Sequence, residues 1–311
     1  MNIKRFLPLV GLVLLFILLY NFDFSTWIAL IYQIPLPLFL LTLTSSLPVI
    51  FISNIQWQYL LKKQDIYVSF LYSMKNIFIG YFYGLITPGG IGAYTRVLYL
   101  KNVSNESLEK CFLNIGIFNT IDLISLFFIS IIGAFVFSNL FPLLFYILLF
   151  FCVLWIIFIF FLIRKKTWHW IQNLILRFTI LKKYHTWIST SVETLQHSLP
   201  AKKDVFITCL ISIIGWILRF SIFYLILGLF SIEVSYVYVV FIIAIANIIA
   251  MIPISIYGLG TRETVLIGLF SVFNVSSNAI LSVSLFWFFI IWIIPSILGA
   301  FISLYEGKKF S

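Results

Sequence analysis

The sequence contains few charged residues. Asp, Glu, Lys and Arg make up only 10% of its 311 residues, whereas an ordinary soluble domain carries roughly 25%. Apolar residues account for 62% of the chain, and the mean hydropathy is +1.13. This composition excludes a soluble globular protein and predicts an all-α, polytopic membrane helix bundle. A span needs about 20 residues, so the chain can hold several spans but little additional soluble domain.

Cysteine and histidine are also scarce, with three residues of each. The cysteines lie in apolar runs and are expected to be buried thiols, while the histidines share one polar loop. Neither set has the spacing of a disulfide framework, a zinc site or a catalytic triad, and no P-loop or Gly-x-Ser-x-Gly motif occurs. We therefore expect no metal, no cofactor and no catalytic residue. The six residues are Cys111, Cys152, Cys209, His169, His185 and His197.

The net charge of +10 comes from Lys and Arg that flank apolar runs. Positive charge at span ends mainly marks the loops that face the cytoplasm, and it also attracts anionic lipid. Nucleic acid is therefore not expected as a partner. Asp23 and Glu233 fall in loops expected outside, where no Lys or Arg occurs. We expect an inner-membrane protein with both termini in the cytoplasm, and Ser104 as the cap of the third span. The expected full spans are residues 6–20, 35–61, 111–137, 141–163, 205–230 and 278–304.

Two related glycine motifs interrupt apolar runs, at residues 87–96 and 253–263. Each places a proline before Gly-x-Gly and an arginine just after it, and each leaves only a half-span behind. These features predict re-entrant, broken-helix hairpins near residues 67–101 and 236–275. The hairpins would enter from opposite faces, as in the inverted repeats of many transporters. A competing interpretation makes 238–253 a full span with its break inside.

We expect a single membrane domain over residues 1–311, with halves at 1–163 and 205–311. The cytoplasmic loop between them, 164–204, carries eight Lys/Arg residues and two acids. Trp168 and Trp170 alternate with basic residues there, which indicates an amphipathic helix on the inner leaflet. An ordinary solvated linker is the alternative.

The few charges inside apolar runs are informative, because a charge at mid-bilayer costs about 2.5–3.5 kcal/mol on insertion scales. Arg96 and Arg262 follow the two glycine turns, where free N–H groups at a helix start favour anions. They are expected to bind a lipid phosphate as planar forks, with Arg219 adding positive charge. Asp122 and Glu263 would orient the arginines or take up a proton. The glycines expected to allow close backbone approach are Gly90, Gly92, Gly258 and Gly260.

A structural alternative remains open for the same residues. The charges could form ion pairs that lock the bundle, for example Arg219 with Asp122, without binding any lipid.

The residues 87–96, Asp122 and 257–263 together resemble the lysylphosphatidylglycerol synthase transmembrane region, also called the flippase-like membrane family. The resemblance covers about residues 2–304, and its most specific element is Gly-Leu-Gly-x-Arg-Glu at 258–263. This chain differs at residues 92–95, where the family often has Gly-Gly-Asp, and at Phe118 and Asn119, where it often has Glu-Arg. In full-length members this region precedes a second membrane part and a soluble aminoacyl-transfer domain. It is implicated in moving lysylphosphatidylglycerol across the bilayer.

The resemblance implies a flippase-like protein that translocates or presents an anionic lipid, either a phospholipid or a polyprenyl-phosphate carrier. A second hypothesis is a membrane anchor or subunit for a separate lipid- or glycan-modifying enzyme. Lysylphosphatidylglycerol synthesis itself is a third, disfavoured because we expect the chain, which runs to Ser311, to hold the membrane part without the transferase domain.

Overall fold

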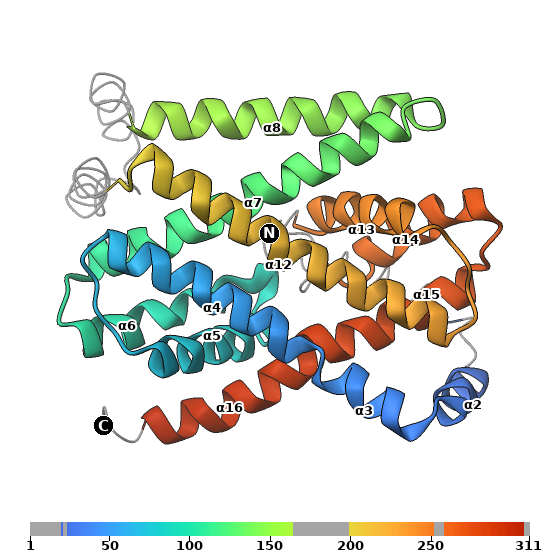
Figure 1. The fold of residues 1–311 in the computed structure, drawn as a ribbon, viewed down its shortest axis with the longest axis horizontal. Helices are drawn as coiled ribbons and strands as arrows, with labels where there is room; N and C mark the ends of the chain where they lie inside the picture. Colours follow the sequence, from blue (N-terminus) through green and yellow to red (C-terminus); the bar gives the residue numbers. More distant parts are fainter. Residues whose placement is uncertain (1–19, 21–23, 164–198, 252–257, 308–311) are drawn as a thin grey trace, which may run out of the picture.

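The structure, a computed structural model, describes residues 20, 24–163, 199–251 and 258–307, and the account below is limited to them. These residues form helices and turns, with no strand among them (Figure 1). Most of the expected first span and the expected amphipathic helix of the 164–204 loop lie outside the described residues.

Four helical segments are long and apolar enough to cross a membrane, which confirms a multi-pass membrane protein. The first combines α3 (Leu36–Thr44) and α4 (Ser46–Lys63), and the next two are α7 (Leu108–Val136) and α12 (Lys202–Leu229). The fourth joins α15 (Ser277–Phe288), the π-helical η4 (Phe289–Ile293) and α16 (Ile294–Gly307).

Two further helices accompany these spans. The apolar α8 (Pro142–Ile163) follows α7 where a return span was expected, but its stretch Pro142–Ile157 is shorter than the four candidate spans. The short α2 (Phe24–Gln33) forms most of the segment that was expected as a loop outside the membrane. Its helical structure agrees with its composition, since Phe24–Gln33 contains no glycine, proline or charge.

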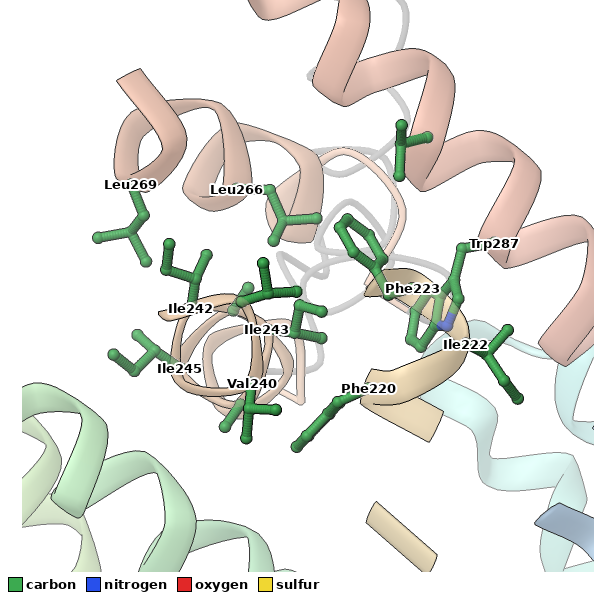
Figure 2. Close-up of a cluster of buried hydrophobic side chains, with 14 of the residues drawn as sticks. Phe220, Ile222, Phe223, Val240, Ile242, Ile243, Ile245, Leu266, Leu269 and Trp287 are labelled. Atoms are coloured by element: carbon green, nitrogen blue, oxygen red, sulfur yellow. The ribbon is translucent and has the colours of Figure 1, made fainter. Parts of the chain in front are cut away.

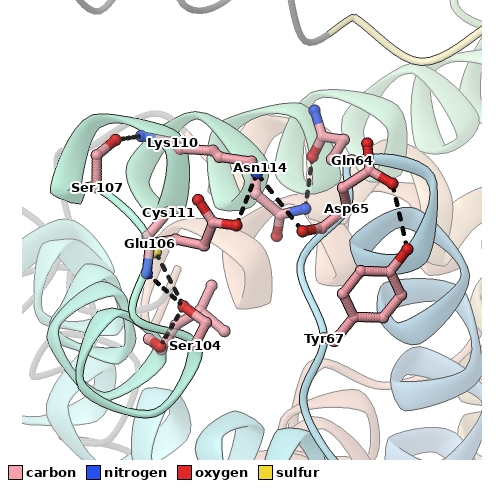
Figure 3. Close-up of polar contacts among 10 residues, drawn as sticks. Gln64, Asp65, Tyr67, Ser104, Glu106, Ser107, Lys110, Cys111 and Asn114 are labelled. Carbon is pink, nitrogen blue, oxygen red and sulfur yellow. Dashed lines mark hydrogen bonds and ion pairs between the residues drawn. The ribbon is translucent and has the colours of Figure 1, made fainter.

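The predicted cap of α7 is wrong by three residues. Ser107, not Ser104, precedes the helix, and its hydroxyl accepts a hydrogen bond from the N–H of Lys110 at 3.1 Å (Figure 3). Ser104 is instead the last residue of the preceding helix, with its hydroxyl bonded to the Leu100 carbonyl at 2.8 Å. Asn105 ends that helix with a positive φ of 57°, which the short Asn side chain tolerates.

Both glycine motifs interrupt helices that fold back on themselves. The first unit consists of α5 (Phe70–Leu85), the 3₁₀ helix η2 (Pro88–Thr95) and α6 (Arg96–Ser104). The Tyr72 hydroxyl of α5 donates to the Tyr99 carbonyl of α6 at 2.9 Å. The second unit consists of α13 (Tyr236–Ala250), α14 (Thr261–Phe270) and the short η3 (Ser271–Phe273), with α14 packed against α13.

The two units enter the bundle from opposite ends. The Lys63–Asp204 ion pair, at 3.2 Å, joins the end of α4 to the start of α12, and we call this the lysine end. The α5–α6 unit begins there, because Gln58 of α4 donates to the Val68 carbonyl just before α5. At the far end, Phe137 contacts both Tyr238 at the start of α13 and Phe273 after α14. Figure 1 shows the two units pointing toward each other along the bundle.

The main hydrophobic core surrounds α13, where α12, α14 and α15 converge (Figure 2). α13 is apolar around its whole circumference, and a helix of that kind is expected to be buried. Phe223 packs edge-on against Trp287 at 5.8 Å between ring centroids, which connects α12 to α15. On the α7 side, a Cβ added at Gly133 would lie 2.7 Å from the Cβ of Phe241, so this glycine allows α7 to approach α13 closely.

A second core lies between α4, α5, α6 and α7, and it contains polar side chains. The Trp57 indole donates to the Asn114 side chain at 2.8 Å. Asn114 in turn donates to Gln64 at 2.6 Å (Figure 3). These groups are buried but satisfied, as polar groups away from water must be. This core supports the first glycine motif.

Candidate functional site

The first glycine motif forms a tight turn that only glycine fits. Gly90 has a φ of 68°, and a Cβ added at Gly92 would overlap the backbone carbonyl of Tyr83. The N–H of Gly92 donates to the Thr87 hydroxyl at 2.7 Å, which fixes the turn. η2 then leads directly into α6, whose first residue is Arg96.

Arg96 turns into the second core, where only 7% of the residue is exposed. Its Nη2 donates to the Asn119 side chain at 2.9 Å. The guanidinium lies 5.3 Å from the ring centroids of both Trp57 and Phe118, as in cation–π contacts. The Asn76 side chain donates to the Arg96 carbonyl at 3.0 Å, which anchors the start of α6 to α5.

Arg219 and Asp122 face each other halfway along α12 and α7. Arg219 Nη2 donates to the Ser53 hydroxyl at 3.1 Å, and its guanidinium lies 4.6 Å from the Trp216 ring centroid. Its Nη1 is 4.0 Å from Asp122 Oδ2, too long for a hydrogen bond. Asp122 Oδ1 instead accepts from the Ser212 hydroxyl at 2.7 Å. The predicted pair therefore exists, but it is loose.

Arg96 of α6 and Arg219 of α12 lie against successive turns of the same two helices, α4 and α7. On α4, Trp57 beneath Arg96 and Ser53 beside Arg219 are four residues apart, so they share one face. On α7 the phenylalanine beneath Arg96 likewise lies four residues before Asp122. Both arginines also act electrostatically on the Asp122 carboxylate. The structure thus brings together three of the predicted site residues.

The second glycine motif builds the start of α14. Gly258 and Gly260 have φ angles of 78° and 83°, and the Glu263 carboxylate accepts from the Gly260 N–H at 2.7 Å. A glutamate three residues after the N-cap that bonds back to the cap N–H is half of a capping box. This explains why Glu263 follows the glycines at that spacing.

Arg262 and Glu263 form a fully buried ion pair, 1% and 0% exposed. Arg262 donates to Glu263 Oε1 through both Nε and Nη2, and the same oxygen accepts from the Ser284 hydroxyl at 2.8 Å. The guanidinium also lies 5.0 Å from the ring centroid of Trp287. In this structure the Arg262 fork is engaged by Glu263, as in the structural alternative.

The sequence analysis missed the neutral residues that hold these charges. They lie on apolar helices, and their only signal is a polar or indole group in an otherwise aliphatic stretch. They are Ser53, Trp57, Asn119, Ser212, Ser284 and Trp287.

Around the two motifs and midway along α7 and α12, the described residues carry more positive than negative charge. Arg96, Arg219 and Arg262 lie there against the carboxylates of Asp122 and Glu263, whereas the buried acids Asp204 and Glu306 pair with Lys63 and Lys75 at the lysine end. This set of charges is net positive, and a bound anion would offset that positive charge. Within the described ranges, no group of three or more His, Cys, Asp or Glu side chains could hold a metal ion.

The comparison with curated proteins found no match for this chain. The family described as "Lysylphosphatidylglycerol synthase TM region" matches residues 7–299, nearly the whole sequence. The chain, a multi-pass helical membrane protein, therefore belongs to the lysylphosphatidylglycerol synthase transmembrane-region family.

Proposed function

We propose that this protein is flippase-like and translocates or presents an anionic lipid, a phospholipid or a polyprenyl-phosphate carrier, in the inner cell membrane. The observation that carries the proposal is the excess of arginine over carboxylate around the two glycine motifs and midway along α7 and α12. Buried charge is costly in a membrane and normally serves a substrate or ion pathway. Family membership supports a role in lipid-modifying systems.

In this proposal Arg96 and Arg219 contact the lipid phosphate directly. A guanidinium presents paired N–H donors that match two phosphate oxygens, and these two arginines contact residues one helical turn apart on α4. Arg262 contributes positive potential while Glu263 holds it at the start of α14. The glycines Gly90, Gly92, Gly258 and Gly260 form the turns that place the helix starts inside the bundle.

The opposed directions of the two broken-helix units support an inverted-repeat mechanism of alternating access. The lysine end would face the cytoplasm, because lysines gather there. This orientation also places the C-terminal end of α16 inside, since Lys75 of α5 pairs with Glu306 of α16 at 3.1 Å. Reporter fusions after Ser311 would test this orientation, and an external reporter would contradict it.

Reconstitution of the purified protein tests the proposed activity. Liposomes of phosphatidylcholine would contain a trace of fluorescent phosphatidylglycerol, and a membrane-impermeant quencher added outside reports the fraction of label exposed. We expect the protein to move labelled phosphatidylglycerol but not labelled phosphatidylcholine, whose headgroup has no net charge. Exposure of both labels at the same rate would indicate general membrane leakage and contradict the proposal.

The family description also favours a second candidate, a membrane anchor or subunit of a lipid- or glycan-modifying enzyme such as a lysylphosphatidylglycerol synthase. An anchor would move no lipid in the same liposomes. It would copurify with an enzyme after gentle solubilisation, so the two candidates predict opposite results in two experiments.

A further inference from the structure

We propose that Asp122 takes up a proton when Arg219 turns from it to the lipid phosphate, so that one proton crosses the membrane with each anionic lipid. This inference rests on the proposed function and adds its energy source. It comes from a difference between Asp122 and Glu263, the two acids that lie beside the arginines.

Glu263 is held firmly in place by its surroundings. It accepts hydrogen bonds from the Gly260 N–H, from two nitrogens of Arg262 and from the Ser284 hydroxyl, and none of it is exposed. The bond from the Gly260 N–H ties the carboxylate to the second glycine turn. Glu263 and Arg262 therefore cannot separate easily.

Asp122 is held far more loosely. Its carboxylate accepts one hydrogen bond, from Ser212, and its arginine partner is 4.0 Å away. The side chains of Asp122 and Arg219 are 22% and 13% exposed although both lie halfway along their helices. Their contact can therefore be exchanged without unfolding a turn.

The groups that face Asp122 come from two elements. Arg219, Trp216 and Ser212 lie on α12, and Arg96 lies at the start of α6. The Cys209 thiol of α12 also interacts electrostatically with Asp122. Within the described ranges, only the two arginines among these carry a charge. The ionisation of Asp122 therefore depends on where the guanidinium of Arg219 lies.

The exchange balances in charge. Without lipid, Arg96, Arg219 and the Asp122 carboxylate sum to +1. A phosphate monoanion that takes Arg219 would leave Asp122 uncompensated in a low-dielectric interior, where an isolated carboxylate neutralises by binding a proton. The loaded site then sums to +1 again, from two arginines, one phosphate and a neutral carboxylic acid. Release of the lipid returns Arg219 to Asp122 and frees the proton, so the cycle moves one proton and one anion together.

The wild-type protein gives a direct test, in liposomes of phosphatidylcholine with a trace of fluorescent phosphatidylglycerol. Electroneutral transport should follow a pH gradient, with lipid asymmetry approaching about tenfold per pH unit, since each unit is a tenfold ratio of protons. The rate and direction of this transport should not change with a membrane potential set with potassium and valinomycin. Wild-type transport that follows the potential and ignores the pH gradient would overturn the inference while leaving the proposed function intact. The absence of any lipid movement would overturn both.

The substitution Asp122→Asn removes the proton acceptor and keeps the shape of the side chain. Transport by this variant should follow the potential and lose its response to the pH gradient, because the lipid would now cross as an anion alone. Glu306→Gln is the matched control, since Glu306 is also a buried acid but lies at the lysine end, paired with Lys75. The control should keep the wild-type response to pH. An Asp122→Asn variant that still follows the pH gradient would overturn the inference.

Discussion

The indole N–H of Trp287 donates a hydrogen bond to the backbone carbonyl of Arg219 at 3.2 Å. The same indole ring lies against the guanidinium of Arg262. One side chain of α15 thus touches the second glycine motif and the helix that carries the loosely paired arginine. We expect a change in either place to affect the other through this residue.

The replacement Trp287→Phe tests this connection. Phenylalanine keeps an aromatic face for Arg262 but removes the indole hydrogen bond to the Arg219 carbonyl, which is worth about 0.5–1.5 kcal/mol. We expect a lower thermal unfolding temperature in detergent and a modest loss of lipid movement. Trp287→Leu should cost more, because it also removes the cation–π contact. Equal stability of the two variants would show that the aromatic contact with Arg262 contributes nothing.

Glu263→Gln should destabilise the protein strongly. Removing one partner of a buried ion pair costs about 3–5 kcal/mol, because the other charge is left uncompensated. Here Arg262 would lose its only carboxylate contact among the described residues, and the cap of α14 would weaken. Thermal unfolding of the detergent-solubilised variant measures the effect. A variant as stable as the wild type would show that the pair is dispensable for the fold.

Gly92→Ala tests whether the first turn needs glycine for close packing. The added Cβ would overlap the Tyr83 carbonyl, and this is backbone that cannot rotate away. We expect poor insertion or a large loss of thermal stability. Gly116→Ala on α7 is the matched control, since an added Cβ there meets no atom within 4 Å. If both variants behave alike, the close approach at Gly92 is not important for stability.

Much of this arrangement could be predicted from the sequence, and the reasons are local. A proline followed closely by Gly-x-Gly is unfavourable inside a helix, so both breaks and the short helices after them were expected. The lysines at residues 62 and 63 likewise mark the end of α4.

The contacts around the charges could not be predicted in the same way. That Asn119, Trp57 and Phe118 surround Arg96 depends on how α4, α6 and α7 pack, which no local pattern encodes. The cap of α7 was misplaced because Ser104 and Ser107 have the same local chemistry. Only the length of α6 decides between them.

Arg96→Lys should separate the charge of Arg96 from its shape. Lysine keeps the positive charge but has neither the planar fork for a phosphate nor the delocalised face that stacks on Trp57 and Phe118. If Arg96 binds the phosphate as a fork, the variant should insert normally, and its movement of fluorescent phosphatidylglycerol should fall about tenfold, which corresponds to 1.4 kcal/mol.

Asn119→Ala is the informative comparison, because it removes the side-chain oxygen that accepts from Nη2 of Arg96 and leaves the guanidinium in place. That variant should bind phosphatidylglycerol at least as well as the wild type in native mass spectrometry. Unchanged transport by Arg96→Lys would mean that the site uses only the charge, and a parallel loss of lipid binding in Asn119→Ala would assign Arg96 to the structural lock.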